Sequence, residues 1–241
     1  MLNSLLANLA ALKRILFSAR FDGQQFDGNY TMRAEKHARK DESRAEQQHI
    51  TGWLTARAVK IERVLDVGCN TGIPLDFTCS MLHCAGVGVD INPTSIEKAR
   101  QSLRAYDFLQ YDGHTLPFEN NSFGHAMLHH VIGHVQDPDA VIAEIVRVLR
   151  PGGTLSLITT NGWYQFWQTP ANIYRHFRPD PTILRYYTSA RLVRLLKRHG
   201  LEVEHVVPWS PGTAKSKNIC RLRLMVLAKK CQEPSGASLG S

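Results

Sequence analysis

Residues 63–72 have the sequence RVLDVGCNTG, which joins a short apolar run, Arg63–Val67, to the turn Gly68–Gly72. A run of valine and leucine favours a buried strand, and the glycines let the chain turn tightly into a following helix, expected through Phe77–His83. This order is typical of a parallel sheet that binds a ligand at the carboxyl ends of its strands. Taken alone, the GxxxG spacing fits a plain turn equally well. Asn70 also stands where a dinucleotide-binding GxGxxG motif has its middle glycine.

Strands and helices alternate over most of the chain. Further strands are expected at Gly86–Val89, Asp107–Tyr111, Gly124–His129, Thr154–Thr159, Leu201–Val207 and Arg221–Ala228. Further helices are expected at Arg33–Val59, Pro93–Ala105, Asp137–Leu149 and Ser189–His199. Helical crossovers imply parallel pairing, so the pattern predicts a three-layer α/β/α, doubly wound, mostly parallel seven-stranded sheet. The last two strands have no helix between them and are expected to form an antiparallel hairpin at one edge of the sheet.

Composition limits the class of protein. The chain has 241 residues, 43% of them hydrophobic, and a formal net charge of +8, which excludes a wholly disordered chain. Its apolar stretches fall short of the roughly 20 residues that a membrane span needs. Five cysteines without a CxxC pair suit a reducing compartment and exclude a disulfide framework or a zinc knuckle. We predict a helical lid at 1–59, one domain at 60–231 and a disordered tail at 232–241.

The first 21 residues contain no acidic side chain, and leucines recur at the spacing of one helix face. This amphipathic helix is predicted to be a lid or packing helix of a cytoplasmic protein. A mitochondrial presequence, and hence a matrix location, is the alternative, because such segments are also amphipathic and poor in acid. The same helix allows association with a membrane surface.

Two further carboxylates follow predicted strands. Asp90 lies 22 residues beyond Gly68, where a carboxylate accepts two hydrogen bonds from a ribose diol. Its plainer interpretation is an acid at a helix N-terminus, since Pro93 begins a helix. Asp112 and Gly113 end the third strand, where a carboxylate accepts from an exocyclic amine; alone, they fit an ordinary Asp-Gly turn.

Together, residues 64–72, Asp90, 112–118 (DGHTLPF), 122–123 (SF), 134–138 (HVQDP) and 144–153 (EIVRVLRPGG) closely resemble the class I S-adenosylmethionine-dependent methyltransferases. The nearest subgroup is methyltransferase type 11, which contains enzymes of ubiquinone and menaquinone biosynthesis, and the resemblance covers about residues 60–160. It implies that S-adenosylmethionine is the cofactor. It assigns the methionine part to Asp66, Gly68, Cys69, Asn70 and Gly72, the ribose to Asp90, the adenine face to Ile91, and the adenine edge to Asp112 and Gly113.

The chain departs from the family pattern twice. Asn70 replaces a usual glycine, which puts the loop's contact with the methionine carboxylate in doubt, and Gly124 replaces a usual aspartate at a structural position. Tyr30, between the first two predicted helices, is a weaker candidate to close on the cofactor.

The histidines after the fourth strand are the candidate catalytic residues. Strand direction puts His129 and His130 at the methyl end of the cofactor, and His129 is counted among the cofactor contacts as well. A histidine that titrates near neutrality removes a proton from a phenol, hydroxyl or ammonium group. The alternative is that His130 merely lines the pocket. His125 is expected to be structural.

An aromatic stretch after the fifth strand, at about 161–187, is predicted to form a cap over a flat, anionic or hydroxylated substrate. The candidate substrate-binding residues are His134, Trp163, Trp167, Tyr174 and Arg175. His134 falls on the family's HVxDP position, where packing or capping is the commoner role, and about half of the aromatic rings are expected to pack the cap itself.

The leading hypothesis is a methyltransferase acting on an oxygen or nitrogen atom of a small organic molecule. The basic C-terminal third, with thirteen basic and four acidic side chains after residue 150, would also suit an RNA methyltransferase. Against nucleic acid, the stretch after the fourth strand is HHVI, whereas base-amino methyltransferases usually carry an Asn/Asp-Pro-Pro-aromatic motif there. A cofactor-binding regulatory protein without activity is a further alternative, and quinone methylation at a membrane is another. No metal is expected, and the oligomeric state is not determined by the sequence.

Overall fold

The computed structural model describes residues 2–16, 40–57, 60–174, 180, 182–210 and 222–231, and the side chains of 14–16, 40–43 and 172–174 lie outside the description. The predictions for Tyr30, Arg175 and the tail at 232–241 therefore fall outside the described residues.

The sheet has seven strands in the order β3-β2-β1-β4-β5-β7-β6. Their bounds are β1 Arg63–Val67, β2 Ala85–Asp90, β3 Asp107–Gln110, β4 Phe123–His129, β5 Leu149–Thr160, β6 Leu201–Trp209 and β7 Arg223–Lys230. Strands β1 to β5 pair in parallel, whereas β7 lies antiparallel between β5 and β6. The predicted sheet and its antiparallel C-terminal hairpin are confirmed.

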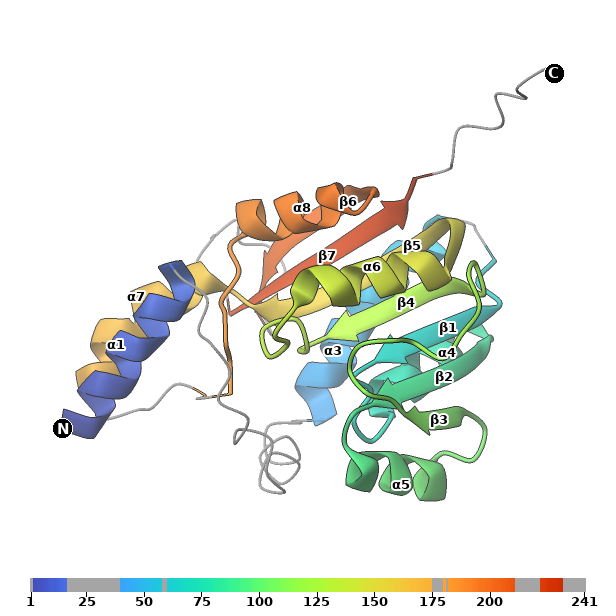
Figure 1. Ribbon diagram of the computed structural model, residues 1–241, viewed down its shortest axis with the longest axis horizontal. Helices are drawn as coiled ribbons and strands as arrows, with labels where there is room; N and C mark the ends of the chain where they lie inside the picture. The colour runs from blue at the N-terminus through green and yellow to red at the C-terminus, as the bar shows by residue number, and fades with distance from the viewer. Residues whose placement is uncertain are drawn as a thin grey trace, which may run out of the picture.

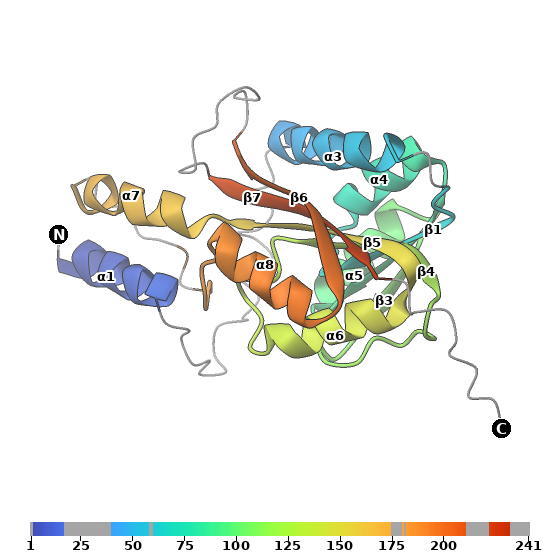
Figure 2. The ribbon, with the colours of Figure 1, turned by 90° about the horizontal axis from the view of Figure 1, so that it is seen from above.

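Most of the helices form two outer layers on the faces of the sheet (Figures 1 and 2). Their bounds are α1 Leu2–Leu16, α3 Lys40–Thr55, α4 Ile73–Leu82, α5 Pro93–Ser102, α6 Pro138–Val148, α7 Gly162–Tyr174 and α8 Ser189–Arg198. In Figure 2, α3 and α4 lie on one side of the sheet and α6 and α8 on the other. α1 and α7 lie side by side at one end of the molecule, away from these layers. No helix in the described ranges is long and apolar enough to cross a bilayer.

Several boundaries differ from expectation, and two of the differences have a clear local cause. α5 ends at Ser102 instead of Ala105, because Leu103 has left the helical region at φ −130° and ψ 67°. β5 begins at Leu149, whereas the sequence predicts a strand only from Thr154. Phe123 pairs with Leu149 before an irregularity in the ladder, and Gly152 there has φ +75°, so the proline and glycines bend the strand without ending it.

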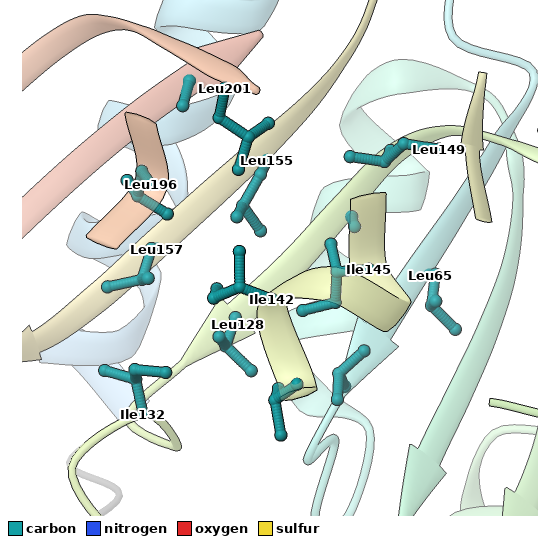
Figure 3. Close-up of a cluster of buried hydrophobic side chains, with 14 of the residues drawn as sticks. Leu65, Leu128, Ile132, Ile142, Ile145, Leu149, Leu155, Leu157, Leu196 and Leu201 are labelled. Atoms are coloured by element: carbon teal, nitrogen blue, oxygen red, sulfur yellow. The ribbon is translucent and has the colours of Figure 1, made fainter. Parts of the chain in front are cut away.

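Apolar side chains cover both faces of the central strands. Figure 3 shows the core beneath α6 and α8, where Leu65 of β1 and Leu128 of β4 meet Ile142 and Ile145. The opposite core lies beneath α3 and α4 and takes the alternate strand positions, among them Val64 of β1. Because successive side chains of a strand point to opposite faces, Asp66 lies on the α3 and α4 face, at the carboxyl end of β1.

Candidate active site

The turn after β1 forms a cradle of backbone held in the left-handed region. Gly68, Asn70 and Gly72 have φ of +78°, +49° and +77°. A Cβ on Gly68 would lie 2.2 Å from Cγ2 of Val131, so glycine is required there by space as well as by conformation. Asparagine tolerates the left-handed region better than most residues, which explains how Asn70 replaces the family's usual glycine.

Two buried oxygen atoms at this cradle have no hydrogen-bond partner among the described residues. They are Oδ2 of Asp66 and Oδ1 of Asn70. Burial, and then the charge of Asp90, raises the pKa of Asp66 to about 7. Buried acceptors without donors are costly, so their presence indicates a missing donor. An ammonium group such as that of methionine supplies donors and a positive charge, and these residues therefore fit the methionine part of S-adenosylmethionine.

Asp90 connects the end of β2 to the cradle. Its Oδ2 accepts a hydrogen bond from the backbone N–H of Asn70 and its Oδ1 from that of Asn92, both at 2.9 Å. Burial raises the pKa of Asp90, although these N–H groups oppose the rise. Asn92, not Asp90, caps α5, because its side chain accepts from Thr94 and Ser95. Asp90 therefore lies beside the N-terminus of α5 without capping it, and its other oxygen contacts the cradle; its contact with a ribose stays a prediction.

Ile91 and the Asp112–Gly113 turn lie next to each other although 20 residues separate them. The Ile91 side chain is 40% exposed, and a Cβ on Gly113, which has φ +84°, would lie 3.3 Å from its Cγ2. Asp112 is exposed, and its Oδ1 accepts from the backbone N–H groups of His114 and Thr115, which lower its pKa. The turn interpretation thus describes what Asp112 does here. Its contact with an adenine edge stays a prediction.

Cys69 is buried in the cradle, and burial raises the pKa of its thiol, with Asp66 and Asp90 adding to the effect. It is therefore a neutral lining residue and no nucleophile.

His129 is part of a buried hydrogen-bond network between the sheet and α3. Its Nε2 lies 2.9 Å from Oγ of Ser156, and its Nδ1 lies 3.1 Å from Nε2 of Gln47. Oε1 of Gln47 accepts from Thr78, so the Gln47 amide nitrogen donates to Nδ1 of His129. Burial lowers the pKa of His129 well below its ordinary value, and the neighbouring histidines add to this.

Both nitrogens of His129 are therefore occupied within the protein, and the prediction that it acts as a base or faces the cofactor is corrected. His125, as expected, is structural: it is fully buried, and its two ring nitrogens contact Thr154 and Ser156.

The side chain of His130 has a different environment from that of His129. Its φ of +61° turns it out of β4, and its side chain is 41% exposed. Its Nε2 lies 2.9 Å from Oε2 of the buried Glu46, whose Oε1 accepts from Nε of Arg223 at 3.3 Å. Burial raises the pKa of Glu46, but His130 and Arg223 outweigh it, and the net pKa is lowered. Glu46 is thus a buried carboxylate shared by His130 and Arg223.

Glu46, Gln47 and Arg223 were missed by the sequence analysis. One signal existed for Glu46: it stands four residues before Ile50 and eight before Leu54, on the apolar edge of α3. An acid on such an edge is seldom buried without a partner.

The predicted substrate residues that the structure describes come from two segments, the loop after β4 and α7. Nδ1 of His134 lies 3.1 Å from both the carbonyl oxygen and Oγ1 of Thr182, so this side chain holds the segment that follows residue 181. Trp163 and Trp167 are exposed on α7, and Tyr174 ends that helix. Their contact with a substrate stays a prediction.

Part of the chain is similar to known methyltransferases. Residues 65–157 match the model of a methyltransferase domain family. The chain is 32% identical over 130 residues to an O-methyltransferase of Pyrenophora dematioidea, which covers 46% of this chain and 49% of the relative. It is 28% identical over 152 residues to a sterol 24-C-methyltransferase of Debaryomyces hansenii, which covers 59% of this chain and 40% of the relative. The chain thus spans less than half the length of these relatives.

A solved structure of an S-adenosylmethionine-dependent methyltransferase from Aquifex aeolicus has the same fold. It superposes with a TM-score of 0.61 at 18% identity, over 85% of this chain and 99% of that one. The matched domain contains Asp66, the cradle, Asp90 and the turn at Asp112. Residues 65–157 thus match a methyltransferase domain, and the fold around them is that of S-adenosylmethionine-dependent methyltransferases.

Proposed function

We propose that the protein transfers a methyl group from S-adenosylmethionine to an oxygen or nitrogen atom of a small organic molecule, with His130 as the base. The observation that carries this is the pairing of a half-exposed histidine with a buried carboxylate next to the cradle. Val131, the residue after His130, is the one that a Cβ on Gly68 would strike. His130 therefore stands beside the loop that fits the methionine part of the cofactor.

The Glu46 carboxylate decides which nitrogen of His130 takes a proton. Because an ionised carboxylate only accepts hydrogen bonds, Nε2 of His130 donates to it, and the neutral ring keeps its lone pair on Nδ1. No described residue makes a hydrogen bond to Nδ1. When bound, the cofactor supplies an electrophilic methyl group on a sulfonium; His130 removes the acceptor's proton at Nδ1 and releases it to solvent.

Arg223 has a positioning role. It contacts the second oxygen of Glu46 and so helps to keep that carboxylate ionised and turned toward Nε2 of His130. Of the two named relatives, the sterol 24-C-methyltransferase supports a small organic substrate, although its acceptor is a carbon atom, and the O-methyltransferase supports an oxygen acceptor.

The test compares three variants by calorimetry with S-adenosylhomocysteine and by product formation on a panel of hydroxyl and amine metabolites. In His130→Gln we expect kcat to fall by roughly 10²–10⁴-fold, since glutamine aligns a donor but takes no proton near neutral pH. Cofactor affinity is expected to stay within about twofold, because the histidine faces the acceptor. Glu46→Gln is expected to lower kcat about tenfold, because the amide can turn either its oxygen or its nitrogen toward Nε2 of His130 and no longer fixes which ring nitrogen carries the proton.

His199→Gln is the matched control. His199 pairs with Asp139 at 2.8 Å between α8 and α6, so this variant breaks a similar pair outside the candidate active site. Its turnover should equal wild type. If His130→Gln keeps wild-type turnover, proton removal by His130 is refuted.

A further inference from the structure

α1 buries its small and polar side. Ser4, Asn8 and Ala11 are buried at the spacing of one helix face. Three leucines lie on the other side, where Leu2, Leu6 and Leu9 are 68%, 55% and 47% exposed, whereas Leu5 and Leu12 are half-buried. A helix on the surface of a globular protein normally does the reverse, with its apolar stripe against the core.

α7 has the same arrangement. Gln165 and Thr169 are buried, whereas Trp163, Phe166 and Trp167 are 43%, 44% and 61% exposed. The exposed rings meet edge to face, with centroids 6.1 Å apart for Trp163 and Phe166 and 5.5 Å for Phe166 and Trp167. These six residues, three leucines of α1 and three aromatic residues of α7, are called the outer stripe below.

The two helices contact each other and lie together at one end of the molecule, as both views show (Figures 1 and 2). Helices that bury polar or small residues and turn leucine and tryptophan outward are typical of packing in a lipid environment, where apolar side chains face hydrocarbon. Tryptophan in particular prefers the interface between lipid and water.

The charge of the two helices indicates which lipid headgroups they would bind. Neither α1 nor α7 contains an aspartate or glutamate. Lys13 is exposed four residues beyond Leu9, and the whole chain carries a net charge of +8. A basic, acid-free apolar surface is complementary to the anionic headgroups of a bilayer.

We propose that the outer stripe docks the protein on the surface of an anionic lipid bilayer. At 15 and 13 residues, α1 and α7 are shorter than the roughly 20 residues of a spanning helix, so they would lie in the headgroup region. The proposal concerns localisation of the whole protein and does not depend on which substrate it methylates.

Flotation of the purified protein with vesicles tests this. The vesicles contain phosphatidylcholine alone or with about 30% phosphatidylglycerol. We expect binding to the anionic vesicles and about 100-fold weaker partitioning of Leu6→Ser/Trp167→Ser, since each lost side chain removes about tenfold. Lys13→Gln should weaken binding to anionic vesicles about fivefold and leave binding to neutral vesicles unchanged.

The matched control is Met81→Ser. Met81 is 50% exposed on α4, outside the pair of helices, and its loss should leave partitioning unchanged. Because the substituted side chains are exposed, both variants should keep the wild-type unfolding midpoint. Equal flotation of the double variant and the wild type would overturn the proposal. So would a lipid-independent dimer, seen by sedimentation velocity, that only the double variant dissociates, because the outer stripe would then join two copies of the chain.

Discussion

Replacing Asp66 by asparagine should make the protein more stable and should, at the same time, weaken its binding of the cofactor. Asp66 is buried, its Oδ2 has no partner among the described residues, and burial together with Asp90 raises its pKa to about 7. Above that pH the folded protein therefore holds a buried carboxylate that nothing in the described chain neutralises. Asparagine keeps the shape and removes the charge.

The magnitude follows from the shift in pKa. Between the ordinary 3.8 and about 7, the folded protein retains a proton that the unfolded chain has lost. Stability therefore falls as the pH rises through this window, by about 4 kcal/mol in total at about 1.4 kcal/mol for each tenfold step. In the variant, the amide hydrogens of asparagine are buried without an acceptor, which reduces the gain in the free energy of unfolding by about 1–2 kcal/mol. Asp66→Asn is thus expected to raise the free energy of unfolding by about 2–3 kcal/mol at pH 8.5. At pH 5.5 only about half of this loss has accumulated, so the expected gain shrinks to about 0–1 kcal/mol.

Urea unfolding at the two pH values, with and without S-adenosylhomocysteine, measures both effects. The ligand should stabilise the wild type strongly at pH 8.5, because its ammonium group pairs with the Asp66 carboxylate, and the variant much less. Asp107→Asn is the control, since Asp107 is an exposed carboxylate at the start of β3.

Two results would contradict the reasoning. If Asp66→Asn is no more stable relative to wild type at pH 8.5 than at pH 5.5, the buried carboxylate carries no penalty. If the ligand stabilises the variant as much as the wild type, Asp66 does not hold the methionine ammonium group.

Three further expectations concern the cofactor loop and the partners of the protein. Asp90→Ala should weaken S-adenosylmethionine binding by about 2–4 kcal/mol in calorimetry, and unchanged affinity would refute the ribose contact. Gly68→Ala should destabilise the protein by about 2–4 kcal/mol in urea, because its Cβ meets Val131. Gly200→Ala, at φ +71° with nothing within 4 Å, carries only the conformational cost of about 1 kcal/mol. We also expect no micromolar RNA binding at physiological salt; a clear, salt-sensitive shift with total RNA would favour the nucleic-acid alternative.

Much of the fold could be predicted from the sequence because its signals are local. The run Arg63–Val67 and the turn after it predict β1 and the cradle, since apolar pattern and glycine conformation act within a few residues. The long β5 was less predictable. Its proline and glycines predict that no strand includes them. The strand begins before them, at Leu149, only because Leu149 pairs with Phe123 of β4.

The candidate site was predictable in part for the same reason. Asp66 and Asp90 each follow from a strand end in the chain, and the parallel sheet brings such ends to one edge. The different environments of His129 and His130 could not be predicted in this way. They are adjacent in the sequence, yet one is enclosed by Gln47 and Ser156 and the other turns out at φ +61°.

By itself, the sequence determined the order of strands and helices, the conformation of the cradle and the carboxylates at the strand ends. Only the tertiary structure decided that Glu46 meets His130, 84 residues away, and Arg223, 177 residues away. It also decided that α1 and α7 turn their apolar sides outward. The physical reason is range: backbone conformation and hydrophobic period depend on neighbours in the chain, whereas the partner of a buried charge depends on which helix packs over which strand.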